Sequence, residues 1–322
     1  MKKLFIAMMA MAAFAACSNE EPVATLQGDA IAFGDAFVDN ATKAIIENSN
    51  DLKGFTVFGN VKGTGDVVAL YGNGATVTRG TAGLNEAWAC DVTRYWTPSC
   101  TYNFAAVDGH SGVTLVKGVP THIAYTVTSA DPKDLVYGVA TAQTNDSSVP
   151  SGDVVPVTGE GLTPNVVAFT MNHLLSRVKV SFQNALATEA TDYRYVISGV
   201  KAVAAGSGTY TIASDTWAPG ADADIVYQAG EVILDANATT DYAAQLLIPT
   251  SPVDLEFTYK LEFQESAGVW KAINSGTITK ENILTPVKNH SYHITVQLKA
   301  GAQIDFTVAT LATWGDTTTT IQ

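Results

Sequence analysis

The sequence is poor in cysteine, in basic side chains and in long apolar runs. Only three of its 322 residues are cysteine. Lysine and arginine together number 18, against 31 acidic residues. A surface this acidic repels phosphate backbones and anionic headgroups, which argues against nucleic acid as a partner. Beyond the N-terminal segment no apolar stretch is long enough to form a transmembrane helix.

Motifs that mark catalytic sites are missing as well. The chain has no G-x-S-x-G, no H-E-x-x-H and no complete G-x-G-x-x-G. His290 and His293 have an H-x-x-H spacing, but on a strand they point to opposite faces and cannot share a metal. We therefore expect no enzyme, no metal and no other cofactor.

The first 16 residues predict a cleaved signal peptide. Lys2 and Lys3 precede a short apolar run that ends at Ala16. Cys17 follows directly, so the segment resembles a bacterial lipoprotein signal, which implies acylation of Cys17. The acidic pair Glu20 and Glu21 resembles an export tag for the outer face of the outer membrane. We expect a lipid-anchored, surface-exposed protein, with an ordinary cleaved signal as the alternative.

The remaining chain predicts an all-β fold. Apolar residues alternate with polar ones in many short segments separated by Gly, Asn, Asp and Pro clusters, as in antiparallel sandwiches. About 300 residues suggest two domains, and the Pro-rich run 145–164 places the boundary between 17–163 and 164–322. Val167, Phe169 and Met171 share one parity and Val178 the other, which predicts a bulge or short helical turn at 173–177.

Cys90 and Cys100 are the cysteines left after Cys17. An exported protein resides where disulfides form. If residues 97–99 turn a hairpin, however, Cys90 lies too far from the turn to face Cys100. A Cys90–Cys100 disulfide and two free, buried thiols both remain open.

An ordered series of short segments resembles the fimbrillin family, that is, the FimA/Mfa-like type V pilins with their anchor and minor subunits. The series covers almost the whole chain. Its members are Ile31–Phe33, Thr42–Ala44, Gly54–Gly59, Tyr95–Trp96, Tyr102–Ala106, Asp134–Gly138, Met171–Val180, Leu247–Pro249, Asn289–Ile294 and Trp314.

The resemblance implies two transthyretin-like β-sandwich domains and assembly by strand exchange. In that family a trypsin-like protease cuts the lipidated precursor after a basic residue behind the first strand, which here points to Lys43 or Lys53. The first strand then leaves a groove, and the C-terminal strand of another subunit fills it. The expected partners are other pilin subunits in a fimbria on the cell surface, where they support adhesion.

Both ends of the chain have strands suited to such an exchange. Ile31, Phe33 and Phe37 are apolar residues of a short N-terminal segment, whose removal would expose an apolar trough and a sheet edge. Near the C-terminus one parity is apolar over Ile304, Phe306, Val308, Ala312 and Trp314. Burying five such side chains would contribute on the order of 10 kcal/mol before ordering costs.

Two alternatives stay open. Fimbrillins commonly have Arg at the processing position, whereas this chain has Lys43; if the first strand stays in place, the protein would be a lipidated anchor or minor subunit. The second alternative is a monomeric, glycan-binding lipoprotein of the cell surface. A glycan-binding site of this kind would need exposed, coplanar aromatic rings. Its candidates are Trp88, Trp96, Trp217 and Trp270.

Overall fold

A computed structural model describes residues 30–38, 52–79, 88–144, 155–156, 166–311 and 318–320. In these ranges the regular secondary structure is β-strand, apart from one three-residue 3-10 helix, η1 (Ala300–Ala302). The all-β prediction is confirmed. None of the helical structure in the described ranges is long and apolar enough to cross a membrane. Cys17, Lys43, Ala312 and Trp314 lie outside the described residues.

The N-terminal half is built on one nine-stranded sheet. Its main path runs β1, β11, β9, β6, β2, β4, β5, with β3 beside β2 and β10 beside β9. The strands are β1 (Ala32–Val38), β2 (Gly54–Lys62), β3 (Val68–Ala69), β4 (Ala75–Arg79), β5 (Trp88–Cys90), β6 (Thr101–Asp108), β9 (Val136–Thr144), β10 (Val155–Pro156) and β11 (Val166–His173). The two ends of the sheet approach each other, because the Ile31 amide donates to the Arg94 carbonyl at 2.8 Å. The curled sheet encloses an aromatic-rich core.

The C-terminal half is a sandwich of two sheets. One sheet has the order β18, β12, β22, β23, β24, with β19 beside β12; the other has the order β16, β13, β20, β21, with β17 beside β13. The first comprises β12 (Ser176–Asn184), β18 (Thr239–Asp241), β19 (Gln245–Leu247), β22 (Ser291–Leu298), β23 (Ile304–Leu311) and β24 (Thr318–Thr320); the second comprises β13 (Tyr193–Ala205), β16 (Asp222–Gln228), β17 (Val232–Asp235), β20 (Val253–Ser266) and β21 (Val269–Leu284). Their inward faces meet in one core, where the Phe182 and Phe257 rings lie 4.8 Å apart.

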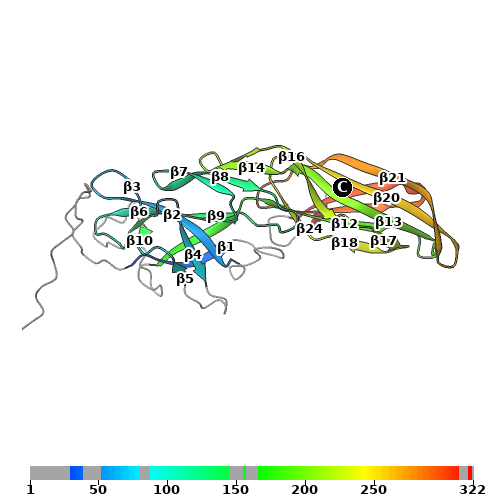
Figure 1. Cartoon of the computed structure of the whole chain (residues 1–322), viewed down its shortest axis with the longest axis horizontal. Coiled ribbons are helices and arrows are strands. Elements are labelled where there is room, and N and C mark those ends of the chain that lie inside the picture. The colour runs from blue at the N-terminus through cyan, green and yellow to red at the C-terminus, as the bar shows by residue number, and fades with distance from the viewer. Residues whose placement is uncertain are drawn as a thin grey trace, which may run out of the picture.

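A third, four-stranded sheet joins the two halves. Its order is β15, β14, β8, β7, so it combines β7 (Gly112–Val116) and β8 (Val119–Thr126) with β14 (Ser207–Thr211) and β15 (Thr216–Pro219). A separate apolar cluster beneath it takes Ile123 and Leu135 from the first half and Leu174 and Trp217 from the second. We call this junction the seam. It holds the two halves in one elongated body (Figure 1).

The division into domains 17–163 and 164–322 stays a prediction. The strand that follows the expected boundary, β11, lies in the N-terminal sheet, because Val167, Phe169 and Met171 point into the N-terminal core. The phase change after it corresponds to a bend at residues 174–175, where the chain passes from that sheet into β12. No helical turn forms at this position.

Candidate functional site

The first strand lies at the edge of the N-terminal sheet with its described apolar side chains in the core. Ile31, just before β1, and Phe33 are 5% and 4% exposed. The Phe33 ring lies 6.0 Å from Tyr71, 5.7 Å from Phe104 and 6.0 Å from Phe169, measured between ring centroids. For Phe37 the structure describes the backbone, which pairs with Thr170. Ile31 and Phe33 of this N-terminal segment therefore belong to the hydrophobic core of the N-terminal sheet.

The backbone of β1 is held mainly from one side. It pairs parallel with β11, and the register shifts between Phe33 and Ala36. On the opposite side, within the described residues, the ties are the Ile31–Arg94 hydrogen bond and an isolated bridge between Ala30 and Tyr95. Loss of this segment would leave β11 as an unpaired sheet edge beside an apolar trough. We call that space the β1 groove.

Of the two candidate processing residues, Lys53 lies just before β2 with an exposed side chain, but its backbone is tied to the end of β4. Its carbonyl accepts a hydrogen bond from the Arg79 amide at 3.0 Å. Leu52 before it is fully buried, and its carbonyl accepts from Nη2 of Arg79 at 3.2 Å. A protease binds an extended, accessible segment, so the peptide bond after Lys53 is poorly placed for cleavage.

The predicted donor strand completes the sheet of its own subunit. β23 pairs antiparallel with β22 from Leu298–Ile304 to Ser291–Leu311, and β24 pairs with the last three residues of its other edge. Ile304, Phe306 and Val308 are only half-buried, although they face the C-terminal core. By contrast, Ile294, Val296 and Leu298 of β22 are almost fully buried. β23 is therefore the less deeply packed of the two strands.

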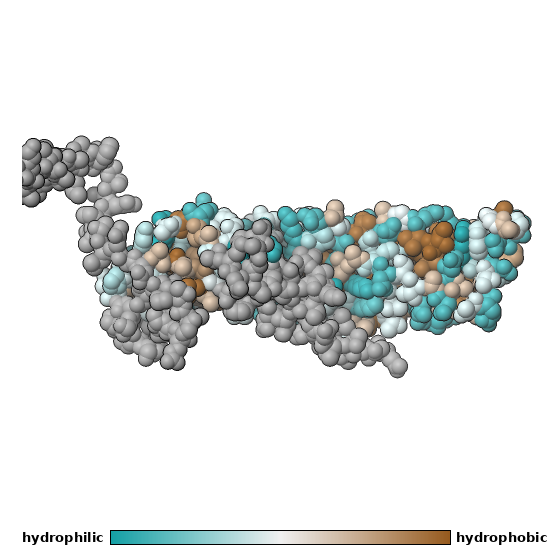
Figure 2. Space-filling model, turned by 90° about the horizontal axis from the view of Figure 1, so that it is seen from below, coloured by the Kyte–Doolittle hydropathy of each residue, from teal (hydrophilic) through white to brown (hydrophobic). Residues whose placement is uncertain are grey.

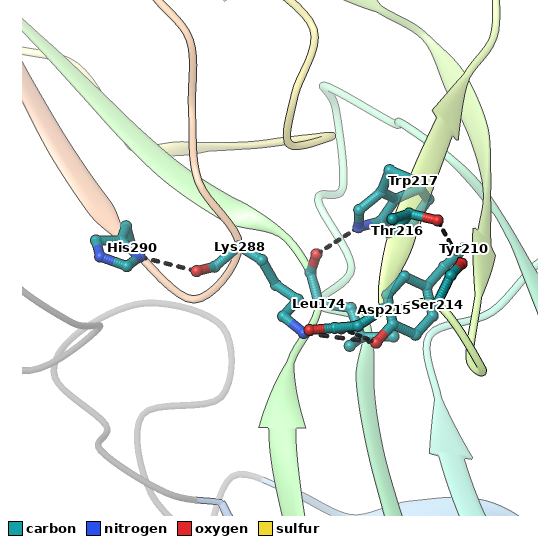
Figure 3. Close-up of polar contacts among 8 residues, drawn as sticks. All are labelled: Leu174, Tyr210, Ser214, Asp215, Thr216, Trp217, Lys288 and His290. Atoms are coloured by element: carbon teal, nitrogen blue, oxygen red, sulfur yellow. Dashed lines mark hydrogen bonds and ion pairs between the residues drawn. The ribbon is translucent and has the colours of Figure 1, made fainter.

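A polar cluster at the seam fastens the β14–β15 hairpin to the loop before β22 (Figure 3). Asp215 accepts hydrogen bonds from the Tyr210 hydroxyl and from Nζ of Lys288. The Lys288 hydrogen bond holds the pKa of Asp215 below its usual range. Nearby, Nε1 of Trp217 donates to the Leu174 carbonyl at 2.9 Å. The cluster therefore holds the β14–β15 hairpin, which pairs with β8 of the first half, against the loop before β22 and the bend at Leu174.

Sequence analysis did not identify this cluster or the buried contact between Asp134 and His173, because the partners are far apart in the chain. Nδ1 of His173 lies 2.7 Å from Oδ2 of Asp134, and both side chains are fully buried. Periodicity does not signal pairs of this kind. In the part of the chain that the structure describes, no three His, Cys, Asp or Glu residues gather closely enough to hold a metal ion.

Cys90 and Cys100 are free thiols in this structure. Cys90 lies in β5 opposite Val77, whereas Cys100 lies just before β6. Both half-buried thiols pack against the N-terminal core. Burial raises the pKa of each.

The four tryptophans proposed as a glycan platform do not form one exposed face. Trp96 and Trp217 are 1% and 8% exposed. Trp88 lies under the Arg79 guanidinium at 5.0 Å, and Trp270 under that of Arg194 at 4.1 Å. Figure 2 shows apolar surface in separate patches between polar residues. This arrangement lacks the coplanar rings that a sugar-stacking site needs.

A search of solved structures finds matches in proteins of Bacteroides, Parabacteroides and Porphyromonas. A fimbrial protein from Bacteroides vulgatus matches with a TM-score of 0.58 and 16% identity, over 81% of this chain and 92% of that one. A putative cell adhesion protein from Parabacteroides distasonis matches with a TM-score of 0.50 and 10% identity, over 89% and 96%. The fimbrial anchor protein Mfa2 from Porphyromonas gingivalis matches with a TM-score of 0.31 and 12% identity, over 80% and 88%.

Comparison of sequences identifies the family of this chain, which the likeness to solved structures alone does not. A search of curated proteins finds no match. The sequence model of a family described as fimbrillin-like matches residues 42–314, which is most of the chain. The match agrees with the β-sandwich architecture and with the ordered segments in the sequence, and this chain belongs to the fimbrillin-like family.

Proposed function

We propose that the protein is a structural subunit of a cell-surface fimbria that supports adhesion. It is exported as a lipoprotein and anchored in the outer membrane by the lipid on Cys17. It is then matured by cleavage after Lys43 and joined to other subunits by strand exchange. The observation that carries the proposal is the position of the first strand: Ile31 and Phe33 are buried in the core, although the backbone of β1 lies at a sheet edge. Family membership and the fold of the fimbrial relatives support it.

Removal of the first strand would expose apolar side chains and an unpaired sheet edge, and binding of a replacement strand would cover both. Burial of Ile31 and Phe33 contributes about 1.5–3 kcal/mol for each side chain. Their loss would also leave the apolar rings of Tyr71, Phe104 and Phe169 facing the β1 groove, and unpaired edges of this kind associate with other strands. An extended segment with alternating apolar side chains would both fill the groove and pair with β11.

β23 has the features of such a segment. Ile304, Phe306 and Val308 alternate with polar residues, and their packing in their own sheet is incomplete. Transfer into the β1 groove, where Ile31 and Phe33 are 5% and 4% exposed, would bury them further. Gly301, which precedes the strand, has φ +72°, a conformation that glycine adopts without strain and that lets the chain change direction there.

A lipidated anchor or minor subunit is the second candidate. The backbone at Lys53 is tied to β4 by the Arg79 amide, so cleavage depends on Lys43, which stands where fimbrillins commonly have Arg. If Lys43 is not cut, β1 stays in place and the subunit ends a fibre without accepting a strand from a neighbour.

The experiment compares Val308→Asp with the matched control Thr307→Asp. Val308 faces the core, whereas the adjacent Thr307 is exposed, so only the first change places a charge in an apolar groove, at a cost of several kcal/mol. After treatment of the precursor with a trypsin-like protease, we expect SDS-resistant ladders from wild type and Thr307→Asp but none from Val308→Asp. Ladders from Val308→Asp, or from a chain truncated after Ala302, would overturn the strand-exchange role.

A further inference from the structure

One continuous stretch of chain carries the connection between the sheet that holds β1 and the sheet that holds β23. β11 pairs with β1 and ends at His173. Two residues later β12 begins at Ser176, and it pairs with β22, the neighbour of β23. Any pull between the β1 groove and the C-terminal strand therefore has a covalent path through residues 173–177.

The first part of this link is fixed by contacts from the N-terminal half and from the β14–β15 hairpin. His173 and Asp134 meet at 2.7 Å, fully buried. The Leu174 amide donates to the Leu135 carbonyl at 2.9 Å. The Leu174 carbonyl in turn accepts from Nε1 of Trp217 at 2.9 Å.

The second part is fixed by the loop that leads into β22. The Leu175 carbonyl accepts from the Asn289 amide at 2.9 Å, and the Arg177 amide donates to the His290 carbonyl at 3.0 Å. Between them, Oγ of Ser176 donates to the Val287 carbonyl at 2.6 Å. Each residue from 173 to 177 is thus bonded to a distant segment. Extension of the link would break several buried polar contacts together, and buried groups left without partners are costly.

β12 and β22 run in the same direction, away from the seam. They pair parallel over eight positions, from Arg177–Ser291 to Asn184–Leu298. Leu298 lies at the end remote from the seam, where its carbonyl accepts from the Ala185 amide at 2.8 Å. The β20–β21 hairpin reaches the same end of the molecule (Figure 1). A detached β23 would leave the sheet from this remote end.

Tension along a fibre would then act on the two strands at opposite ends. The pull from the β1 groove reaches β12 at its first residue, through β11. The pull from a donated β23 reaches β22 at its last residue, Leu298. Parallel strands pulled from opposite ends slide past each other, so the evenly spaced bonds of the parallel ladder are loaded together instead of one after another.

We infer that the molecule is a tension-bearing link in which the β12–β22 ladder is loaded in shear. This inference rests on the proposed strand exchange, because the load enters β22 at Leu298 only if β23 is donated. It also gives the parallel pairing of β12 with β22 a mechanical role that a monomeric surface protein would not require.

Single-molecule pulling of the whole chain in two directions tests the inference. The three native cysteines are replaced by Ser, and handles are attached to new cysteines at exposed positions. Thr170→Cys with Gln303→Cys loads the ladder in shear, whereas Thr170→Cys with Val287→Cys loads both strands from the seam end. We expect a higher mean unfolding force at the same loading rate for the first pair. Equal forces, or a higher force for the second pair, would overturn the inference.

Thermal unfolding of the handle variants and the ladder assay of Val308→Asp serve as controls for the pulling experiment. Thermal unfolding without load should give the same midpoint for both handle pairs, so that a difference in force reports direction, since forced unfolding follows the unfolding rate along the pulled path. The pulling experiment uses a single subunit. Failure of strand exchange, detected with Val308→Asp, is therefore distinguishable from failure of the shear geometry.

Discussion

Replacement of Phe33 by Ala tests whether the first strand is both integral to the precursor and removable from it. Phe33 is 4% exposed and touches three aromatic rings at 5.7–6.0 Å. Truncation of a buried Phe to Ala costs about 3–5 kcal/mol. With an m value of about 2–3 kcal/mol/M, the urea midpoint of the precursor should fall by roughly 1–2 M.

The matched control is Phe55→Ala. Phe55 lies in β2, is 3% exposed, and contacts Trp88 and Phe169 at 5.2 and 5.6 Å. Because β2 stays in the mature subunit, this change should destabilise precursor and processed protein alike. Phe33→Ala should destabilise only the precursor, since the processed subunit has lost that residue.

Kinetics of assembly distinguish the two variants further. Phe33→Ala weakens the hold of β1, so β1 should leave faster and ladders should form sooner after protease treatment. Phe55→Ala damages the groove for both strands and should not accelerate assembly. The reasoning is refuted if Phe33→Ala leaves precursor stability unchanged, or if it slows ladder formation as Phe55→Ala does.

Three other predictions concern the lipid, the cleavage site and the seam. Cys17→Ala should abolish fatty-acid labelling and release a soluble form, and labelling that persists would contradict lipidation at Cys17. Lys43→Gln should prevent the new amino terminus seen by mass spectrometry of surface-shed protein, whereas Lys53→Gln should not; the reverse result would assign cleavage to Lys53. Because the pKa of Asp215 is lowered in the folded state by Lys288, the pair stabilises the fold above the unfolded pKa of about 3.9 and this contribution is lost as pH falls through the folded value. Asp215→Asn should therefore cost up to about 1 kcal/mol at pH 7 in urea unfolding and progressively less as the pH is lowered below about 3.9, and a cost independent of pH would contradict this account.

The sequence predicted the strands and their inward faces well where alternation is regular. Phe257 and Tyr259 in β20, and Ile294 and Val296 in β22, point into the core as their parity indicates. The phase change between Met171 and Val178 also marked a real feature. It corresponds to the passage of the chain from one sheet into the other, at a bend and not at a helical turn.

Sequence by itself predicted a signal at the N-terminus, and it determined the all-β class and the apolar faces around Phe33 and from Ile304 to Val308, because these depend on local order and on a period of two. Only the tertiary structure decided which strands pair. The parallel partners of β1 and β12 come from about 130 and 115 residues further along the chain, and alternation specifies which face of a strand is buried but not which neighbour lies beside it. The polar contacts at the seam, such as Asp134 with His173 and Asp215 with Lys288, likewise exist only once folding brings distant segments together.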